Sequence, residues 1–113
     1  DQYTSKHVFE SLPDGGRIVL RRDPGDSAGV AQIRTHLQEI ARAFAAGDFS
    51  TPAFVHMLSV PGTDVMTARR ADIAYAYTPV DGGGEVRITT TDGEALSAVH
   101  AFLAFQRSDH RAH

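Results

Sequence analysis

Hydrophobic and polar positions follow the same order in two parts of the chain. In the first part, HVFESL and RIVLRR alternate as β-strands do on either side of PDGG, which predicts a β-hairpin. Residues 23–27 then open a helix, and Gly47 marks its end. Between these points the apolar positions recur at helical spacing: Ile33, Leu37, Ile40, Ala41 and Phe44. This part of the chain therefore predicts strand, strand and helix.

The second part follows the same plan. ADIAYAYTP and EVRITTT flank the turn VDGGG, and a second helix follows. Thr91 and Glu94 have the spacing of a capping box, in which a hydroxyl and a carboxylate satisfy backbone N–H groups at the start of a helix. The apolar stripe of this helix contains Leu96, Val99, Phe102 and Leu103.

The two parts also align with each other. GGRIVLRRD matches GGEVRITTTD, Ile33 matches Val99, and Leu37 matches Leu103. We therefore expect a single domain over 1–113, with pseudo-repeats 6–47 and 72–110 joined by a loop 48–71. The predicted fold class is α+β: two ββα units that form an antiparallel sheet of about four strands, with both helices on one face.

The alternation also predicts the composition of the other face of the sheet. If Val86, Ile88 and Thr90 face the helices, then Glu85, Arg87 and Thr89 face away from them. On the preceding strand, Ala74 and Ala76 share one side. A face lined by alanines is smooth enough for another subunit to approach, so we expect a homodimer.

Segment 48–71 is the part that the repeat does not explain. Ser50-Thr51-Pro52 predicts the start of a short helix that runs to about Leu58, and Pro61-Gly62 ends it. Because connecting loops often carry function, we expect the functional residues here.

Composition narrows the class of protein. The 113 residues are 42% hydrophobic and carry a formal net charge of -3, which is typical of a soluble globular domain. The absence of cysteine excludes disulfides, thiolate metal sites and covalent haem attachment. Basic residues are diluted by acidic neighbours, so we expect no nucleic-acid partner, and no apolar run is long enough for a membrane span. With no signal-peptide core we expect a cytoplasmic protein, although secretion stays open because the chain does not begin with Met.

Histidines and methionines are the side chains that suggest chemistry. Imidazole and thioether groups bind copper, and both serve as axial ligands of haem. No spacing forms a specific motif, so a site must be assembled across elements. His56 and Met57 point about 100° apart on a helix, which makes His56 with Met66 the better pair. The predicted ligands are His56, Met66 and His100 first, followed by His36, His7 and His110.

Each candidate also has a structural interpretation. His36 and His100 lie at the edges of apolar stripes, where a ring can pack on the core while its nitrogens meet water or backbone. His110, in the last turn of its helix, can interact with the helix dipole. Met57 and Met66 can fill the core.

Several segments resemble a family of small, mostly uncharacterised bacterial proteins: KHVF, GGRI, IRTHLQEIARAFAAGDFSTP, FVH, VPGTDVM, IAYAY, GGGEVRITT and AVHAFLAFQRSDH. Together they span nearly the whole chain. Such proteins are often labelled aspartate carbamoyltransferase. This chain, with 113 residues, is too short for that enzyme. The recurrent polar positions of the family correspond to the six predicted ligands, so the resemblance implies a metal or haem site.

Three functions follow from these patterns. The first is a small soluble protein that binds a transition metal, copper before others, or haem through His and Met side chains. The second is a non-metal homodimeric module for interaction or regulation. The third is a small enzyme in which His56 or His100 is a general base and Arg69 or Arg70 holds an acidic substrate.

Overall fold

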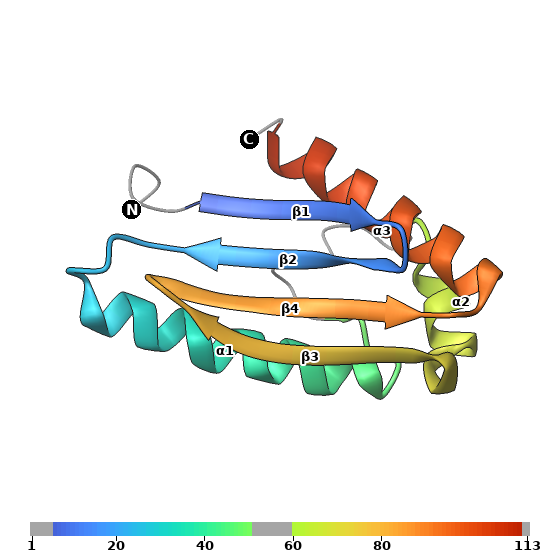
Figure 1. Ribbon diagram of the computed structural model, residues 1–113, viewed down its shortest axis with the longest axis horizontal. Coiled ribbons are helices and arrows are strands. Elements are labelled where there is room, and N and C mark those ends of the chain that lie inside the picture. Colours follow the sequence, from blue (N-terminus) through green and yellow to red (C-terminus); the bar gives the residue numbers. More distant parts are fainter. Residues whose placement is uncertain (1–5, 51–59, 112–113) are drawn as a thin grey trace.

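A computed structural model describes residues 6–50 and 60–111, with side chains in the last helix as far as Ser108. Figure 1 shows the elements in chain order. They are β1 (Lys6–Leu12), β2 (Gly15–Arg21), α1 (Ser27–Ala45), α2 (Thr63–Ala68), the 3-10 helix η1 (Arg70–Asp72), β3 (Ile73–Val80), β4 (Gly83–Thr90) and α3 (Gly93–Arg111).

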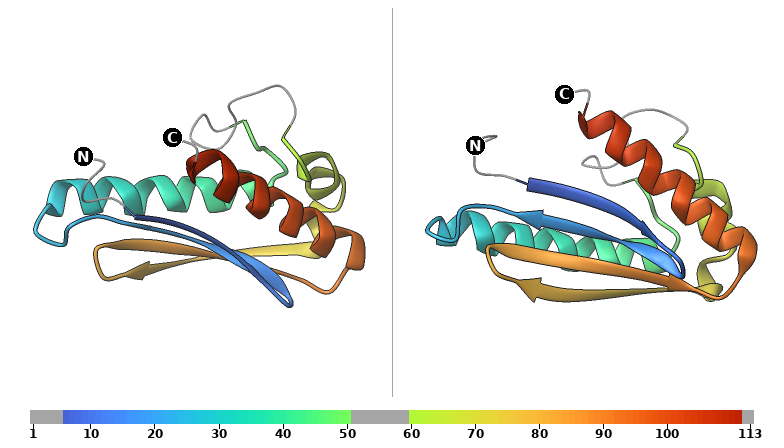
Figure 2. Two further views of the ribbon diagram at one scale, coloured as in Figure 1. Left: turned by 90° about the horizontal axis from the view of Figure 1, so that it is seen from above. Right: turned by 45° about the horizontal axis from the view of Figure 1, so that its top comes forward.

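The strands form one antiparallel sheet in the order β1-β2-β4-β3. Both long helices lie on the same face of this sheet, as the two views in Figure 2 show. The predicted α+β class and the repeated ββα order are therefore confirmed. Among the described residues, no helix is long and apolar enough to cross a membrane.

The sheet has an internal twofold pseudosymmetry. A shift of 68 residues, from Gly15 to Gly83, maps residues 6–12 onto 74–80 and residues 15–21 onto 83–89. The central strands obey the same shift, because the pair Gly15↔Thr89 becomes the pair Gly83↔Arg21, and both pairs are present. The pseudo-axis passes through the pair Ile18↔Val86, and each half contributes one edge strand and one central strand.

The helices follow a shift of 66 residues, from Ser27 to Gly93, and each contains 19 residues. Their starts are capped alike. The carboxylate of Asp26 accepts a hydrogen bond from the Gly29 N–H at 3.0 Å, and that of Asp92 accepts one from the Ala95 N–H at 2.9 Å. The predicted capping box of Thr91 and Glu94 is therefore wrong. Asp92 directly precedes the first helical residue, and Glu94 instead forms an ion pair with Arg69.

Each helix packs mainly on the hairpin of the other half. α1 follows the first hairpin but lies over β3 and β4, while α3 follows the second hairpin and lies mostly over β1. Glycines allow this close approach. A Cβ atom on Gly16 would lie 2.1 Å from Leu103 Cδ1, and one on Gly84 would lie 3.0 Å from Leu37 Cδ1. Gly16 is equivalent to Gly84, and Leu103 is equivalent to Leu37. The same contact between a leucine and a glycine therefore occurs twice, each time between the helix of one half and the hairpin of the other.

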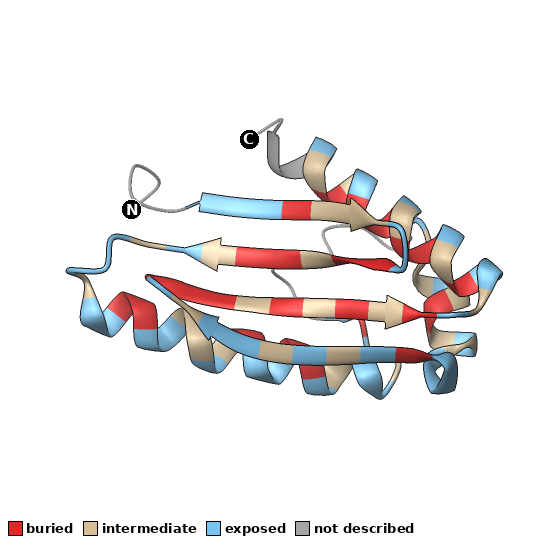
Figure 3. Ribbon diagram, viewed as in Figure 1, coloured by how far each residue is buried: buried red, intermediate tan, exposed pale blue. Residues whose placement is uncertain are grey.

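The core lies between the helices and the sheet, and buried residues alternate along β4 from Gly84 to Thr90 (Figure 3). At its centre Phe44 contacts three aromatic rings, with centroids 4.5 Å from Phe49, 5.8 Å from Phe102 and 5.9 Å from Tyr75. The predicted inward side chains Val86, Ile88 and Thr90 are all buried. The inner layer thus joins residues from both halves.

The joining segment contains structure that the sequence did not predict. The short helix expected from Ser50 to about Leu58 lies, apart from Ser50, outside the described residues. After Pro61 the chain forms α2, and Gly62, with φ of 86°, lies against α3, where a Cβ would be 2.2 Å from the carbonyl oxygen of Ala98. Phe49 and Val60, on either side of residues 51–59, are buried in the core.

Candidate functional site

His100 is tied to the backbone. Its ring is half-buried on α3, and Nε2 lies 2.7 Å from the carbonyl oxygen of Leu12. A carbonyl only accepts hydrogen bonds, so Nε2 donates the proton in this bond, and in a neutral imidazole Nδ1 would be the nitrogen with the lone pair. As a general base His100 would need a carboxylate partner, and the partner that it has is a carbonyl.

The pseudosymmetry explains this bond. His100 is equivalent to Arg34 of α1, and Leu12 is equivalent to Val80. Arg34 donates from Nη2 to the Val80 carbonyl at 2.9 Å and from Nε to the Gly83 carbonyl at 2.8 Å. His100 and Arg34 therefore have the same structural role, because each hydrogen-bonds its helix to the end of an edge strand in the opposite half.

Met66 lies in the core. It is completely buried in α2, within the apolar cluster that joins the sheet and the helices. In this position it fills space, and its sulfur would have to leave the core to reach a metal ion. His56, its predicted partner, lies outside the described residues, as does Met57.

The other predicted ligands lie apart. His36 is half-buried on α1, on the flank that faces away from Arg34. His7 is exposed on β1 at the sheet edge, and the side chain of His110 lies outside the described part of α3. Over residues 6–50 and 60–108, no three His, Asp or Glu side chains come together to hold a metal ion.

The predicted substrate arginines are engaged within the chain. Arg69 forms ion pairs with Asp92, at 3.1 Å, and with Glu94, which join the end of α2 to the start of α3. Arg70 donates from Nη1 to the Thr67 carbonyl at 2.9 Å. Both side chains thus hold the joining segment in place.

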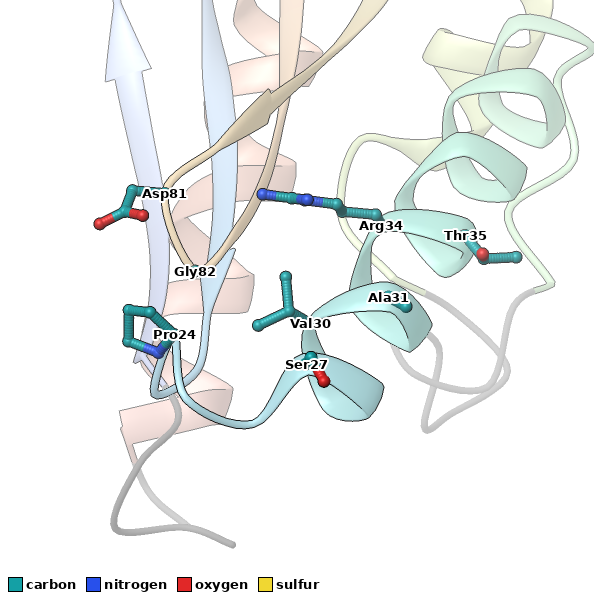
Figure 4. Close-up of a pocket in the computed structure, with 8 residues that line it drawn as sticks. All are labelled: Pro24, Ser27, Val30, Ala31, Arg34, Thr35, Asp81 and Gly82. Atoms are coloured by element: carbon teal, nitrogen blue, oxygen red, sulfur yellow. The ribbon is translucent and has the colours of Figure 1, made fainter.

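An open cleft of about 450 Å³ lies beside the first turns of α1 (Figure 4). Its walls are one side of α1 and the turn between β3 and β4, with Arg34 reaching across. Two of the three guanidinium nitrogens of Arg34 already bond to carbonyls. The lining residues are Pro24, Ser27, Val30, Ala31, Arg34, Thr35, Asp81 and Gly82, and no predicted ligand is among them.

A second hollow of about 460 Å³ lies at the far end of the sheet. Its polar lining residues are Asp14, Asp72, Thr89, Thr90 and Thr91. The Asp14 carboxylate accepts a hydrogen bond from Arg87 at 2.5 Å, and the Thr90 hydroxyl donates to the Asp72 carbonyl at 2.7 Å. These two bonds join the β1–β2 turn and η1 to β4.

No described element covers the outer face of the sheet (Figure 2). Small and apolar side chains follow β3, where Ala74 and Ala76 are exposed as predicted. On β1, Val8 is 42% exposed beside the buried Val19 of β2. This face therefore combines apolar margins with a charged centre.

The charged centre is balanced by ion pairs. Arg17 and Arg87 are direct cross-strand partners, an arrangement of like charges that destabilises a sheet by itself. Arg17 is 2.6 Å from Glu10 and 3.4 Å from Glu85, while Arg87 is 2.5 Å from Asp14. The Arg87 guanidinium, which hydrogen-bonds to Asp14, holds the pKa of that carboxyl below its usual value.

One buried titratable group belongs to none of these surfaces. The Tyr75 hydroxyl lies beneath α1, and burial raises its pKa well above the ordinary value. Its ring packs edge-on against Phe44. Tyr75 therefore acts as an aromatic core residue.

The sequence patterns identified the composition of the outer face but missed the anchoring pair of Arg34 and His100. A signal for that pair was present, because the alignment of Ile33 with Val99 also places Arg34 on His100. Comparisons of the chain with protein-family models, curated proteins and solved structures find no match.

Proposed function

We propose that the chain is a non-metal homodimeric module for interaction or regulation, and that a second copy binds the outer face of the sheet. The observation that carries the proposal is the one-sided cover of the sheet: both long helices lie on one face, and none of the described elements lies on the other. A half-buried antiparallel sheet is stable with one face in water, so the outer face is available for binding.

The side chains of the outer face favour a second copy as the partner. The face carries both signs of charge in adjacent ion pairs, with Arg17 between Glu10 and Glu85. A twofold axis brings the same patch against itself, and mixed charges can then meet opposite charges across the interface. Val8, Ala74 and Ala76 add exposed apolar area.

Sedimentation equilibrium tests this proposal. The chain should show a reversible monomer–dimer equilibrium that EDTA does not change. Val8→Glu introduces a charge on the outer face and should weaken the dimer by at least about tenfold. Ala101→Glu introduces the same charge on the exposed side of α3 and should leave the dimer unchanged. If both variants associate like the original chain, a second copy does not bind the outer face.

Copper or haem binding is the second candidate, and His100 supports it. A histidine that donates from Nε2 to a backbone carbonyl has its ring orientation and tautomer fixed, as metal-bound histidines do, and Nδ1 has the free lone pair. Titration of the purified chain with copper and with haem, followed by absorption spectroscopy, tests this candidate. A spectrum that changes in the original chain but not in His100→Ala would support it. No change in the original chain would rule it out.

A further inference from the structure

The two edges of the sheet are equivalent by pseudosymmetry but differ in how they are protected. On β1, Arg107 of α3 donates from Nη1 to the Phe9 carbonyl at 2.6 Å and so covers the outward-facing backbone. The shift of 66 residues places Ala41 of α1 at the position of Arg107, and the shift of 68 places Tyr77 at that of Phe9. An alanine cannot cover a carbonyl in this way, so α1 provides no equivalent cap for the Tyr77 carbonyl.

Charge differs between the edges in the same direction. β1 carries Lys6 and Glu10, whose equivalents on β3 are Ala74 and Thr78. The whole of β3, IAYAYTPV, has no charged residue. Lysine and other charges on an edge strand oppose pairing with another chain, and their absence permits it. β1 is therefore protected, and β3 is open.

Hydrogen-bond register shows which backbone groups of β3 point outward. The Thr90 N–H donates to the Asp14 carbonyl beyond β2, so the even-numbered residues of β4 bond toward β2. The odd-numbered residues of β4 then bond to residues 74, 76, 78 and 80 of β3. Tyr75 and Tyr77 direct their N–H and C=O groups away from the sheet, and no residue in 6–50 or 60–108 bonds to them.

At both ends of β3 the backbone N–H is not available for pairing, so only the middle of the strand can pair with another strand. The Ile73 N–H already donates to the Arg70 carbonyl at the end of η1. Pro79 has no N–H, which is the expected place for proline on an edge strand. The N–H groups on this edge that have no partner among the described residues are therefore those of Tyr75 and Tyr77.

We propose that β3 is the strand at which a second copy of the chain adds its own β3, in antiparallel register about Ala76. In this register Tyr75 lies opposite Tyr77 of the second copy, and Tyr77 lies opposite Tyr75. The outward N–H and C=O groups of both tyrosines then pair, so the edge is complementary to itself. The two sheets join into one continuous sheet.

The side chains of α1, which lies over β3, leave room for a second copy to pair with the β3 edge. Gly29 of α1 lies against Arg22 at the end of β2, so the opposite flank of α1 faces the β3 edge. That flank carries Arg34, whose guanidinium bonds to the Val80 and Gly83 carbonyls, together with Ala31, Gln38 and Ala45, which are exposed and uncharged. Small side chains let two antiparallel helices approach to about 8 to 10 Å, the spacing needed beside a paired edge.

The edge pairing rests on its own observations, so it stands whether or not the outer face binds a second copy.

A matched pair of variants tests the pairing. Tyr77→Ala removes the side chain and keeps the outward N–H, whereas Tyr77→Pro removes both without breaking the bonds between β3 and β4. By sedimentation equilibrium, Tyr77→Pro should associate at least about tenfold more weakly than Tyr77→Ala. Equal association constants for the two variants would overturn the proposal.

Hydrogen exchange of the unaltered chain gives a test that does not depend on how well a variant folds. The amides of Tyr75 and Tyr77 should exchange at least about tenfold more slowly at concentrations where the chain associates than at high dilution. Exchange of both amides at the same rate at every concentration would overturn the edge pairing.

Comparison with Val8→Glu separates the two surfaces. Loss of association in Val8→Glu but not in Tyr77→Pro would overturn the edge pairing and leave the proposed outer-face dimer standing. Loss in Tyr77→Pro but not in Val8→Glu would support the edge pairing and remove the outer-face dimer.

Discussion

Asp14 shows how a single charge supports the fold. Its carboxylate lies in the β1–β2 turn and accepts a hydrogen bond from Arg87, on the neighbouring central strand, at 2.5 Å. This contact compensates for the direct cross-strand pairing of Arg87 with Arg17. The turn is thus joined electrostatically to the other half of the chain.

The lowered pKa of Asp14 predicts how stability depends on pH. A carboxyl whose pKa is lower in the folded chain than in the unfolded chain stabilises the fold above its ordinary pKa. This contribution is lost as the pH falls below about 4, through the pKa of the folded state. Asp14→Asn should therefore lower the free energy of unfolding near neutral pH and lower it less in acid.

Urea unfolding at about pH 6 and at about pH 2.5 measures this difference. Asp81→Asn is the control, because Asp81 lies in the other hairpin turn and forms no ion pair with a described residue. A deficit for Asp14→Asn that is the same at both pH values would contradict the assignment.

The sequence could identify candidate ligand residues, but it could not show which of them bind a ligand and which only support the fold. A histidine on the shoulder of an apolar stripe can face a ligand or the backbone, and His100 faces the Leu12 carbonyl. Met66 follows a turn that the sequence located correctly, but its complete burial depends on α2 packing against α3. These outcomes depend on tertiary contacts that local patterns do not contain.

At the scale of elements, the Gly-Gly pairs do more than form turns. The sequence interpretation assigned PDGG to a turn, whereas the structure begins β2 at Gly15 and places Gly16 under Leu103. The local pattern gives the hairpin. It cannot show which helix will lie on the glycine, because that helix comes from the other half of the chain.

Added methyl groups test this fit. Gly84→Ala should destabilise the fold by about 1 to 3 kcal/mol, because its Cβ would lie 2.8 Å from Tyr77 and 3.0 Å from Leu37. Gly16→Ala should cost more, since its Cβ would also lie 2.6 Å from the Glu10 backbone oxygen. Urea unfolding measures both changes.

Gly93→Ala is the matched control for these substitutions. No atom lies within 4 Å of a Cβ at Gly93, so stability should change by less than about 0.5 kcal/mol or increase. A cost for Gly84→Ala no larger than that for Gly93→Ala would show that the helix does not need the glycine.

At the scale of the whole molecule, the repeated pattern predicted two ββα units and a one-sided sheet, both of which are present. It did not predict that β2 and β4 would be the central pair, nor that the helices would exchange hairpins. Hairpin patterns fix pairing between neighbours in sequence. Pairing between hairpins depends on which edges and faces complement each other in three dimensions.

Because each helix packs on the hairpin of the other half, we can predict how the chain behaves when it is cut in two. Cleavage within residues 51–59 gives two fragments, each with a helix whose main packing surface lies on the other fragment. Each fragment alone should lack a cooperative unfolding transition, and a mixture should regain one. Circular dichroism during thermal unfolding of the separate and mixed fragments measures this. A cooperative transition in either fragment alone would contradict the dependence.

The exchanged helices also constrain how the protein can evolve. A residue larger than glycine at position 84 would need a smaller side chain at position 37, and one at position 16 would need a smaller side chain at position 103. Covariation among homologues should therefore link positions far apart in sequence, in opposite halves of the pseudo-repeat. Neither half can diverge freely, because each inherits the consequences of substitutions in the other.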